Sequence, residues 1–210
     1  MKKCVIVGGA PCDDIKKAAR LIDKDDFLIY CDCGLRYIEQ IGRSPNLVIG
    51  DFDSYENPEL PCETIVLPCE KDDTDTVFAA KEGLSRGFKE FLLIGAVGGR
   101  MDHTLANISI LLMLEKAGAH GIIADDCAVM EFITAQAKEA KKIKDDCRYF
   151  SLLNITGRAE GITIKNAKYP LLNGKITCDY QYGVSNEVLP EKTAEVSVKK
   201  GELLLIKILN

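Results

Sequence analysis

Short apolar runs alternate with longer amphipathic segments along the first 125 residues of the chain. Each run is continuous rather than alternating in polarity, which is typical of a strand buried on both faces. The segments between the runs have helical spacing, and Gly118 gives the last of them a stop signal. This alternation predicts a mostly parallel sheet covered by helices. The predicted strands are Cys4–Val7, Phe27–Tyr30, Leu47–Ile49, Thr64–Leu67, Phe91–Ile94 and Gly121–Ala124, and the predicted helices are Asp14–Ile22, Leu35–Ile41, Thr74–Ser85 and His103–Lys116.

The pattern changes near Tyr149, where short strand-like runs separated by glycines take over. The dipeptide Asn173-Gly174 is a strong signal for a β-hairpin turn. This part of the chain therefore predicts a small antiparallel sandwich or an open barrel. Its predicted strands are Tyr149–Ile155, Ile162–Lys165, Lys175–Tyr182, Ala194–Val198 and Leu203–Ile208.

The segment Asp125–Cys147 is ambiguous, because Ala135–Lys144 has a helical composition and Val129–Ile133 resembles a strand. We favour strands joined by a polar excursion. We expect an α/β domain over residues 1–123 and a small antiparallel β-sandwich domain over residues 124–210.

Composition narrows the class of protein. The chain has 210 residues, of which 47% are hydrophobic and 28% charged, as in ordinary globular proteins. No apolar run is as long as a membrane span, and the apolar run near the amino end is too short for a signal peptide. Nine cysteines without a Cys-x-x-Cys pair indicate reduced thiols and hence a cytoplasmic protein. The net charge of -5 argues against a nucleic-acid partner.

Acidic residues follow four of the predicted strands: Asp32, the run Gly50–Ser54, the run Lys71–Asp75 and the run Gly95–His103. The carboxyl ends of parallel strands meet at one edge of a sheet, so we expect these loops to converge. Converging carboxylates repel each other, and a hard cation such as Mg²⁺ relieves the repulsion. Lys71 and Arg100 add the cations that suit phosphate. Together these parts predict phosphoryl-transfer chemistry.

Each loop also has a purely structural interpretation. The run Asp51-Phe52-Asp53 fits a solvated turn, Asp73 or Thr74 fits a helix N-cap, and Asp102 could cap the next helix. His103 and Asn107 fit one polar helix face. The chain has no Walker loop, no complete Rossmann glycine signature and no Gly-x-Ser-x-Gly elbow, which excludes those sites.

Four motifs together resemble the thiamine pyrophosphokinase family, in order and in approximate spacing. They span nearly the whole chain: Gly50-Asp51-Phe52-Asp53-Ser54, then Lys71-Asp72-Asp73-Thr74-Asp75, then Gly98-Gly99-Arg100-Met101-Asp102-His103 with Asn107, and Gly183-Val184-Ser185-Asn186-Glu187. The resemblance implies transfer of pyrophosphate from ATP to thiamine, giving thiamine diphosphate and AMP. It also implies a homodimer with active sites between subunits.

The resemblance further implies a role for each matching residue. The Mg²⁺ ligands would be Asp51, Asp53 and Asp75, and the catalytic set would add Lys71, Asp72, Arg100 and Asp102. The substrate-binding residues would be Asp32, Thr74, His103, Asn107, Ser185 and Asn186, the last two facing thiamine. Two positions depart from the family pattern: Cys33 replaces the first glycine of an Asp-Gly-Gly loop, and Tyr169 stands where many members have Trp.

Two other functions remain open at this point. A metal-dependent glycosyl or nucleotidyl transferase could use Asp51 and Asp53 as an Asp-x-Asp metal site. A sensor that binds thiamine or a nucleotide without catalysis could keep the same fold, although it would not need so many mutually repelling carboxylates.

Overall fold

The computed structural model describes residues 2–52, 60–70 and 72–210. The chain divides into two compact units, Met1–Asp126 and Cys127–Asn210. Across the described residues, no helix has both the length and the apolar character that crossing a membrane requires.

The first unit is built on a parallel sheet with the strand order β4-β3-β2-β1-β5-β6. The central strand β1 is fully buried, and its Val5 lies opposite Leu28 and Leu92 of its two neighbours. Continuous apolar sequence produces this arrangement because a central parallel strand has no face toward water. The strands are β1 (Cys4–Val7), β2 (Phe27–Cys31), β3 (Leu47–Gly50), β4 (Glu63–Val66), β5 (Glu90–Ile94) and β6 (His120–Ala124).

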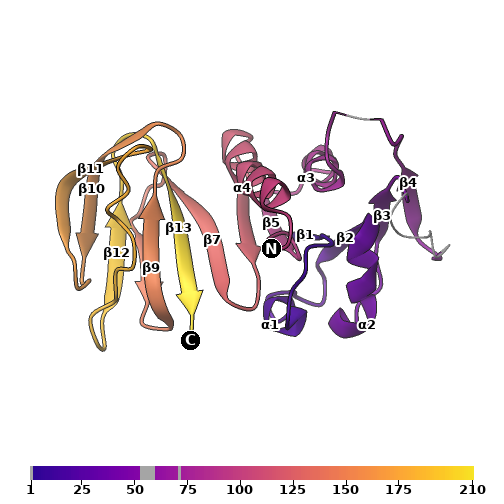
Figure 1. The fold of residues 1–210 in the computed structure, drawn as a ribbon, viewed down its shortest axis with the longest axis horizontal. Helices are drawn as coiled ribbons and strands as arrows, with labels where there is room; N and C mark the ends of the chain where they lie inside the picture. The colour runs from indigo at the N-terminus through magenta and orange to yellow at the C-terminus, as the bar shows by residue number, and fades with distance from the viewer. Residues whose placement is uncertain (1, 53–59, 71) are drawn as a thin grey trace. The chain divides into compact units, whose positions relative to one another are not determined.

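Helices lie on both faces of this sheet, with α1 and α2 on one side and α3 and α4 on the other (Figure 1). The region predicted as one helix, Leu35–Ile41, is instead split into a 3-10 helix and a short α-helix that ends at Gly42 in the left-handed conformation (φ 69°). The helical elements are α1 (Ile15–Ala19), η1 (Asp32–Tyr37), α2 (Ile38–Ile41), α3 (Asp75–Ser85) and α4 (Met101–Lys116).

The second unit contains two layers of antiparallel sheet strands, in the orders β7-β13-β9 and β11-β10-β12-β8. Apolar residues of both sheets, among them Phe150, Ile162 and Leu203, form one buried cluster. The structure therefore confirms the predicted fold class, a helix-covered parallel sheet followed by an antiparallel β-sandwich. The strands are β7 (Ala128–Thr134), β8 (Lys141–Lys144), β9 (Cys147–Leu153), β10 (Arg158–Lys165), β11 (Leu171–Thr177), β12 (Thr193–Ser197) and β13 (Glu202–Leu209).

The predicted hairpin turn at Asn173-Gly174 is wrong, because both residues lie inside β11. Asn173 has a φ of 53°, and the pairing of β11 with β10 shifts register beside it. The left-handed preference of Asn-Gly therefore serves a bulge in the strand rather than a chain reversal. The strand predicted over Lys175–Tyr182 consequently begins earlier and ends at Thr177. In the ambiguous segment, β7 and β8 confirm strands rather than a helix.

Candidate active site

A cavity of about 550 Å³ opens at the carboxyl edge of the parallel sheet in the first unit. Loops that follow the strands supply its walls, as expected for an open parallel sheet. The described lining residues are Gly8, Gly9, Ala10, Pro11, Cys31, Asp32, Cys33, Arg36, Asp51, Cys69, Asp72, Asp73, Thr74, Asp75, Thr76, Gly95, Gly98, Arg100, His103 and Asn107.

Three carboxylates meet in this cavity although they come from three different loops. One oxygen each of Asp32, Asp51 and Asp75 lies within 4.8 Å of the other two. Asp32 begins η1 after β2, Asp51 follows β3, and Asp75 is the first residue of α3. Because three carboxylates at this spacing repel each other when ionised, the cluster favours a bound divalent cation.

Within this cluster, the side chain of Asp32 has a buried oxygen that lacks a hydrogen-bond donor among the described residues. The residue is 8% exposed, and its Oδ2 accepts a hydrogen bond from the Cys33 thiol at 3.2 Å. Its Oδ1 is buried and accepts no hydrogen bond from any of the residues that the structure describes. A buried carboxylate oxygen without a donor is costly unless a ligand satisfies it. The donor set is therefore suited to a hard cation such as Mg²⁺.

In the described part of the first unit, backbone strain falls at the same place. Asp32 has a φ of 32° and Phe52 a φ of 55°, and within the described part of the first unit these are the non-glycine residues with positive φ. Such conformations cost about 1–3 kcal/mol and persist where the surrounding structure enforces them. The strain falls on the two loops that carry Asp32 and Asp51, which is typical of a binding site.

Close backbone packing holds the loop after β2 against the central strand. A Cβ added at Gly34 would lie 2.2 Å from the Val7 carbonyl oxygen, so no side chain fits there. The Cys33 side chain, by contrast, is half-buried and lines the cavity. The family pattern can therefore lose its first glycine at Cys33, whereas the second glycine, Gly34, is required by this backbone approach.

The start of α3 is fixed by two side chains that the sequence placed among the substrate-binding residues. Thr74 is the N-cap, and its Oγ1 accepts a hydrogen bond from the Val77 N–H at 3.3 Å. Asn107 is buried: its Oδ1 accepts from the Thr76 hydroxyl at 2.7 Å, and its Nδ2 donates to the Ala96 carbonyl at 2.6 Å. Both groups are thus engaged in holding the cavity wall together.

Arg100 and Asp102 form an exposed ion pair at the start of α4, where the loop from β5 ends. Arg100 donates from Nη2 to Asp102 Oδ2 at 2.6 Å and from Nε to Oδ1 at 3.2 Å. The hydrogen bond from Arg100, helped by the His103 backbone N–H, lowers the pKa of Asp102 from 3.8 to about 2. Arg100 lines the cavity, and Asp102 is not among its described lining residues.

This pairing predicts the titration of Asp102. At pH 3.8, where an ordinary Asp is half protonated, Asp102 should remain ionised, and the attraction to Arg100 should be lost as the pH falls toward 2. The carboxyl carbon shift of Asp102, followed by NMR, measures this directly. In Arg100→Ala the midpoint should rise toward 3.8; an unchanged midpoint would show that the ion pair is not formed in solution.

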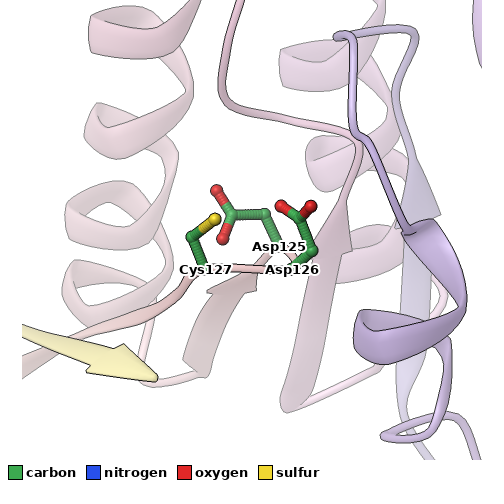
Figure 2. A group of neighbouring side chains, drawn as sticks. All are labelled: Asp125, Asp126 and Cys127. Carbon is green, nitrogen blue, oxygen red and sulfur yellow. The ribbon is translucent and has the colours of Figure 1, made fainter. Parts of the chain in front are cut away.

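A second group of possible metal ligands lies at Asp125, Asp126 and Cys127 (Figure 2). These three residues are consecutive, so their proximity follows from the covalent chain, unlike that of the three aspartates in the cavity. Asp126 Oδ2 also accepts a hydrogen bond from the Asp14 backbone N–H at 3.3 Å, which gives it a structural role. The cavity cluster is therefore the better candidate for a functional metal site.

Ser185 and Asn186 belong to the second unit. Ser185 is exposed and has a φ of 58°, and its backbone N–H donates to the Ser151 hydroxyl at 3.0 Å. The Asn186 side chain is buried and exchanges hydrogen bonds with Tyr169: the Tyr169 N–H donates to Oδ1 at 3.0 Å, and Nδ2 donates to the Tyr169 carbonyl at 2.8 Å. Asn186 thus fixes the segment that carries Tyr169, whose side chain is 60% exposed.

The structure brings most of the predicted residues of the first unit together. Asp53 and Lys71 lie outside the described residues. The sequence placed Asp32 with the substrate, whereas the structure places it in the carboxylate cluster. Sequence reasoning also missed Arg36 and the Gly8–Pro11 loop, although the rule that strand ends share one edge applied to β1 as well. The predicted residues that line the cavity are Asp32, Asp51, Asp72, Thr74, Asp75, Arg100, His103 and Asn107.

An acid-lined cavity at the carboxyl edge of a parallel sheet is where α/β enzymes bind their ligands, and the first unit belongs to that class. Two family models narrow the class. The catalytic domain of thiamin pyrophosphokinase matches residues 18–123, and the vitamin B1 binding domain of thiamin pyrophosphokinase matches residues 139–203. The chain belongs to the thiamin pyrophosphokinase family. The resemblance read from the motifs is thereby confirmed, and the chain is an enzyme of the thiamine diphosphokinase class.

Relatives match along nearly the full length. The chain is 28% identical to the thiamine pyrophosphokinase of Bacillus subtilis (strain 168), and the match covers 99% of each chain. The superposition on the crystal structure of the thiamine pyrophosphokinase from Bacillus subtilis covers 100% of each chain at 26% identity, with a TM-score of 0.84. The thiamin pyrophosphokinase from Geobacillus thermodenitrificans gives a TM-score of 0.80 at 25% identity, covering 99% of this chain and 97% of that one.

Proposed function

We propose that the chain transfers the diphosphoryl group of ATP to the hydroxyl of thiamine with the help of Mg²⁺, giving thiamine diphosphate and AMP. The observation that carries the proposal is the cluster of Asp32, Asp51 and Asp75 at the carboxyl edge of the sheet. Its buried Asp32 Oδ1, without a donor among the described residues, suits a cation that accompanies a polyphosphate. Family membership supplies the substrate class.

In the proposed reaction the thiamine hydroxyl oxygen bonds to the β-phosphorus of ATP, and the bond from that phosphorus to the oxygen bridging the α- and β-phosphates breaks. AMP leaves with the bridging oxygen, and the hydroxyl proton is lost to a base that the geometry does not single out. Mg²⁺, when bound, would neutralise the triphosphate and align it for in-line displacement. Asp32, Asp51 and Asp75 would hold the cation, as the sequence expected for Asp51, Asp75 and also Asp53.

The remaining residues receive supporting roles in the same proposal. Lys71 and Arg100 would stabilise the charge that develops on the phosphates, Asp72 and Asp102 would belong to the same catalytic set, and His103 would contact the substrate. The side chains of Thr74 and Asn107 act by positioning, because both are engaged in hydrogen bonds within the fold.

The second unit would bind thiamine through the segment around Ser185, with Asn186 holding Tyr169 in place. This assigns the nucleotide and the metal to residues 1–123 and thiamine to residues 124–210. The homodimer with active sites between subunits and the cytoplasmic location complete the proposal; the first rests on the family resemblance, and the second on nine cysteines that are all free thiols.

The test is product analysis after incubation with ATP, Mg²⁺ and thiamine. We expect AMP and thiamine diphosphate in equal amounts, with no accumulation of ADP. An Asp-x-Asp glycosyl or nucleotidyl transferase would release no AMP in response to thiamine, and a sensor would bind thiamine in calorimetry without turnover. Either of these two results would refute the proposed reaction.

A further inference from the structure

The charge of the cavity is unbalanced. Five aspartates line it in the described part of the chain: Asp32, Asp51, Asp72, Asp73 and Asp75. The described cations in the lining are Arg36 and Arg100. A polyphosphate that enters this cavity needs cationic partners besides any metal, because the carboxylates repel it.

The two arginines differ in the hydrogen bonds that their guanidinium groups already form. The Arg100 guanidinium donates two hydrogen bonds to Asp102. Arg36 donates from Nε to the Cys33 carbonyl at 2.8 Å, and none of the carboxylates in the described ranges forms an ion pair with it. Arg36 therefore lines the cavity, and among the described residues no acidic side chain pairs with its guanidinium. Bidentate donation to phosphate is the geometry to which this group is suited.

The local fold ties Arg36 to the carboxylate cluster. Asp32, Cys33 and Arg36 share the 3-10 helix η1, and Cys33 and Arg36 lie on one side of it because they are three residues apart. The Cys33 thiol donates to Asp32 Oδ2, while the Cys33 carbonyl accepts from Arg36 Nε. The helix η1 thus carries both a candidate metal ligand, Asp32, and the Arg36 guanidinium, and both line the same cavity.

We propose that Arg36 is a phosphate-binding residue of this cavity and that it contacts the polyphosphate chain of the nucleotide. The inference rests on the proposed function, since it assigns one more contact to the same site. It adds a cation that the motifs of the family resemblance do not contain, at a position that the sequence alone left without a role.

The experiment measures binding of inorganic tripolyphosphate, in the presence of Mg²⁺ and without thiamine, by isothermal titration calorimetry. Arg36→Ala should weaken the affinity roughly 10-fold or more, as expected for the loss of a charge-assisted contact. Arg36→Gln, which keeps a side-chain donor for the Cys33 carbonyl, should lose about as much affinity, and Arg36→Lys should lose less. The salt dependence of binding should also be shallower in Arg36→Ala.

Arg20→Ala is the matched control, because Arg20 is exposed in the same unit and does not line the cavity. Its affinity should equal that of the wild type. Wild-type affinity in folded Arg36→Ala and Arg36→Gln would overturn the inference, as would a wild-type protein that does not bind tripolyphosphate. If Arg36 governs tripolyphosphate binding but thiamine never releases AMP, the proposed reaction fails while the phosphate contact stands.

Discussion

Asp75→Asn should lower kcat/KM for thiamine diphosphate formation roughly 100- to 1,000-fold or more, while the protein stays folded. Asp75 supplies one of the three clustered carboxylates, and its amide replacement keeps the shape of the side chain but removes the charge. The residue is also the first of α3, where a negative charge favours the helix dipole. We therefore expect a stability change of no more than about 1 kcal/mol.

Steady-state turnover and urea denaturation of the same preparation separate these two effects. Asp25→Asn is the matched control, because Asp25 is exposed in the same unit and does not line the cavity; both its turnover and its stability should stay at the wild-type level. Near-normal turnover in Asp75→Asn would contradict the assignment of the metal site.

Gly34→Ala should destabilise the first unit by about 3 kcal/mol, at the upper end of the usual cost of overpacking. The added Cβ would meet the Val7 carbonyl oxygen at 2.2 Å and the Gly8 carbonyl oxygen at 3.1 Å, and both belong to backbone that cannot rotate away. Since η1 also carries Asp32, the shift that relieves this clash should displace the carboxylate cluster. We expect a lower urea midpoint together with lower activity in the fraction that remains folded.

Gly42→Ala provides the comparison for this prediction. Gly42 has a φ of 69°, but a Cβ at this position meets nothing within 4 Å. Its replacement should cost about 1 kcal/mol, from the left-handed backbone alone. Equal destabilisation by the two substitutions would show that the approach of Gly34 to Val7 is looser than the structure has it.

Strands that are buried on both faces were the most predictable elements of the fold. The apolar run Cys4–Val7 is β1 with the same bounds. A central parallel strand is apolar at every position, so the ends of the apolar run mark the ends of the strand. The region Leu35–Ile41 was less predictable, since the chain there forms a 3-10 helix that packs Gly34 against Val7. The prediction of a hairpin turn at Asn173-Gly174 was wrong because residues that prefer the left-handed conformation occur in turns and in strand bulges alike.

The location of the candidate site could be predicted from the sequence better than the set of residues that form it. The rule that parallel strand ends share one edge placed Asp32, Asp51 and Asp75 at one edge of the sheet, and the structure groups Asp32 with the two predicted metal ligands rather than with the substrate contacts. Arg36 could not be recognised from spacing alone, because its role depends on the turn of η1 and on the absence of an acidic partner in the described residues. The burial of Asn186 against Tyr169 is likewise a tertiary feature that the local sequence does not show.

In the proposed reaction a diphosphoryl group moves intact from ATP to thiamine. ATP radiolabelled at the β-phosphorus tests this most directly, with Mg²⁺ and thiamine present and the products separated by chromatography. We expect the label to appear in thiamine diphosphate and the AMP formed with it to be unlabelled. Label retained in ADP, with thiamine monophosphate as the other product, would contradict it.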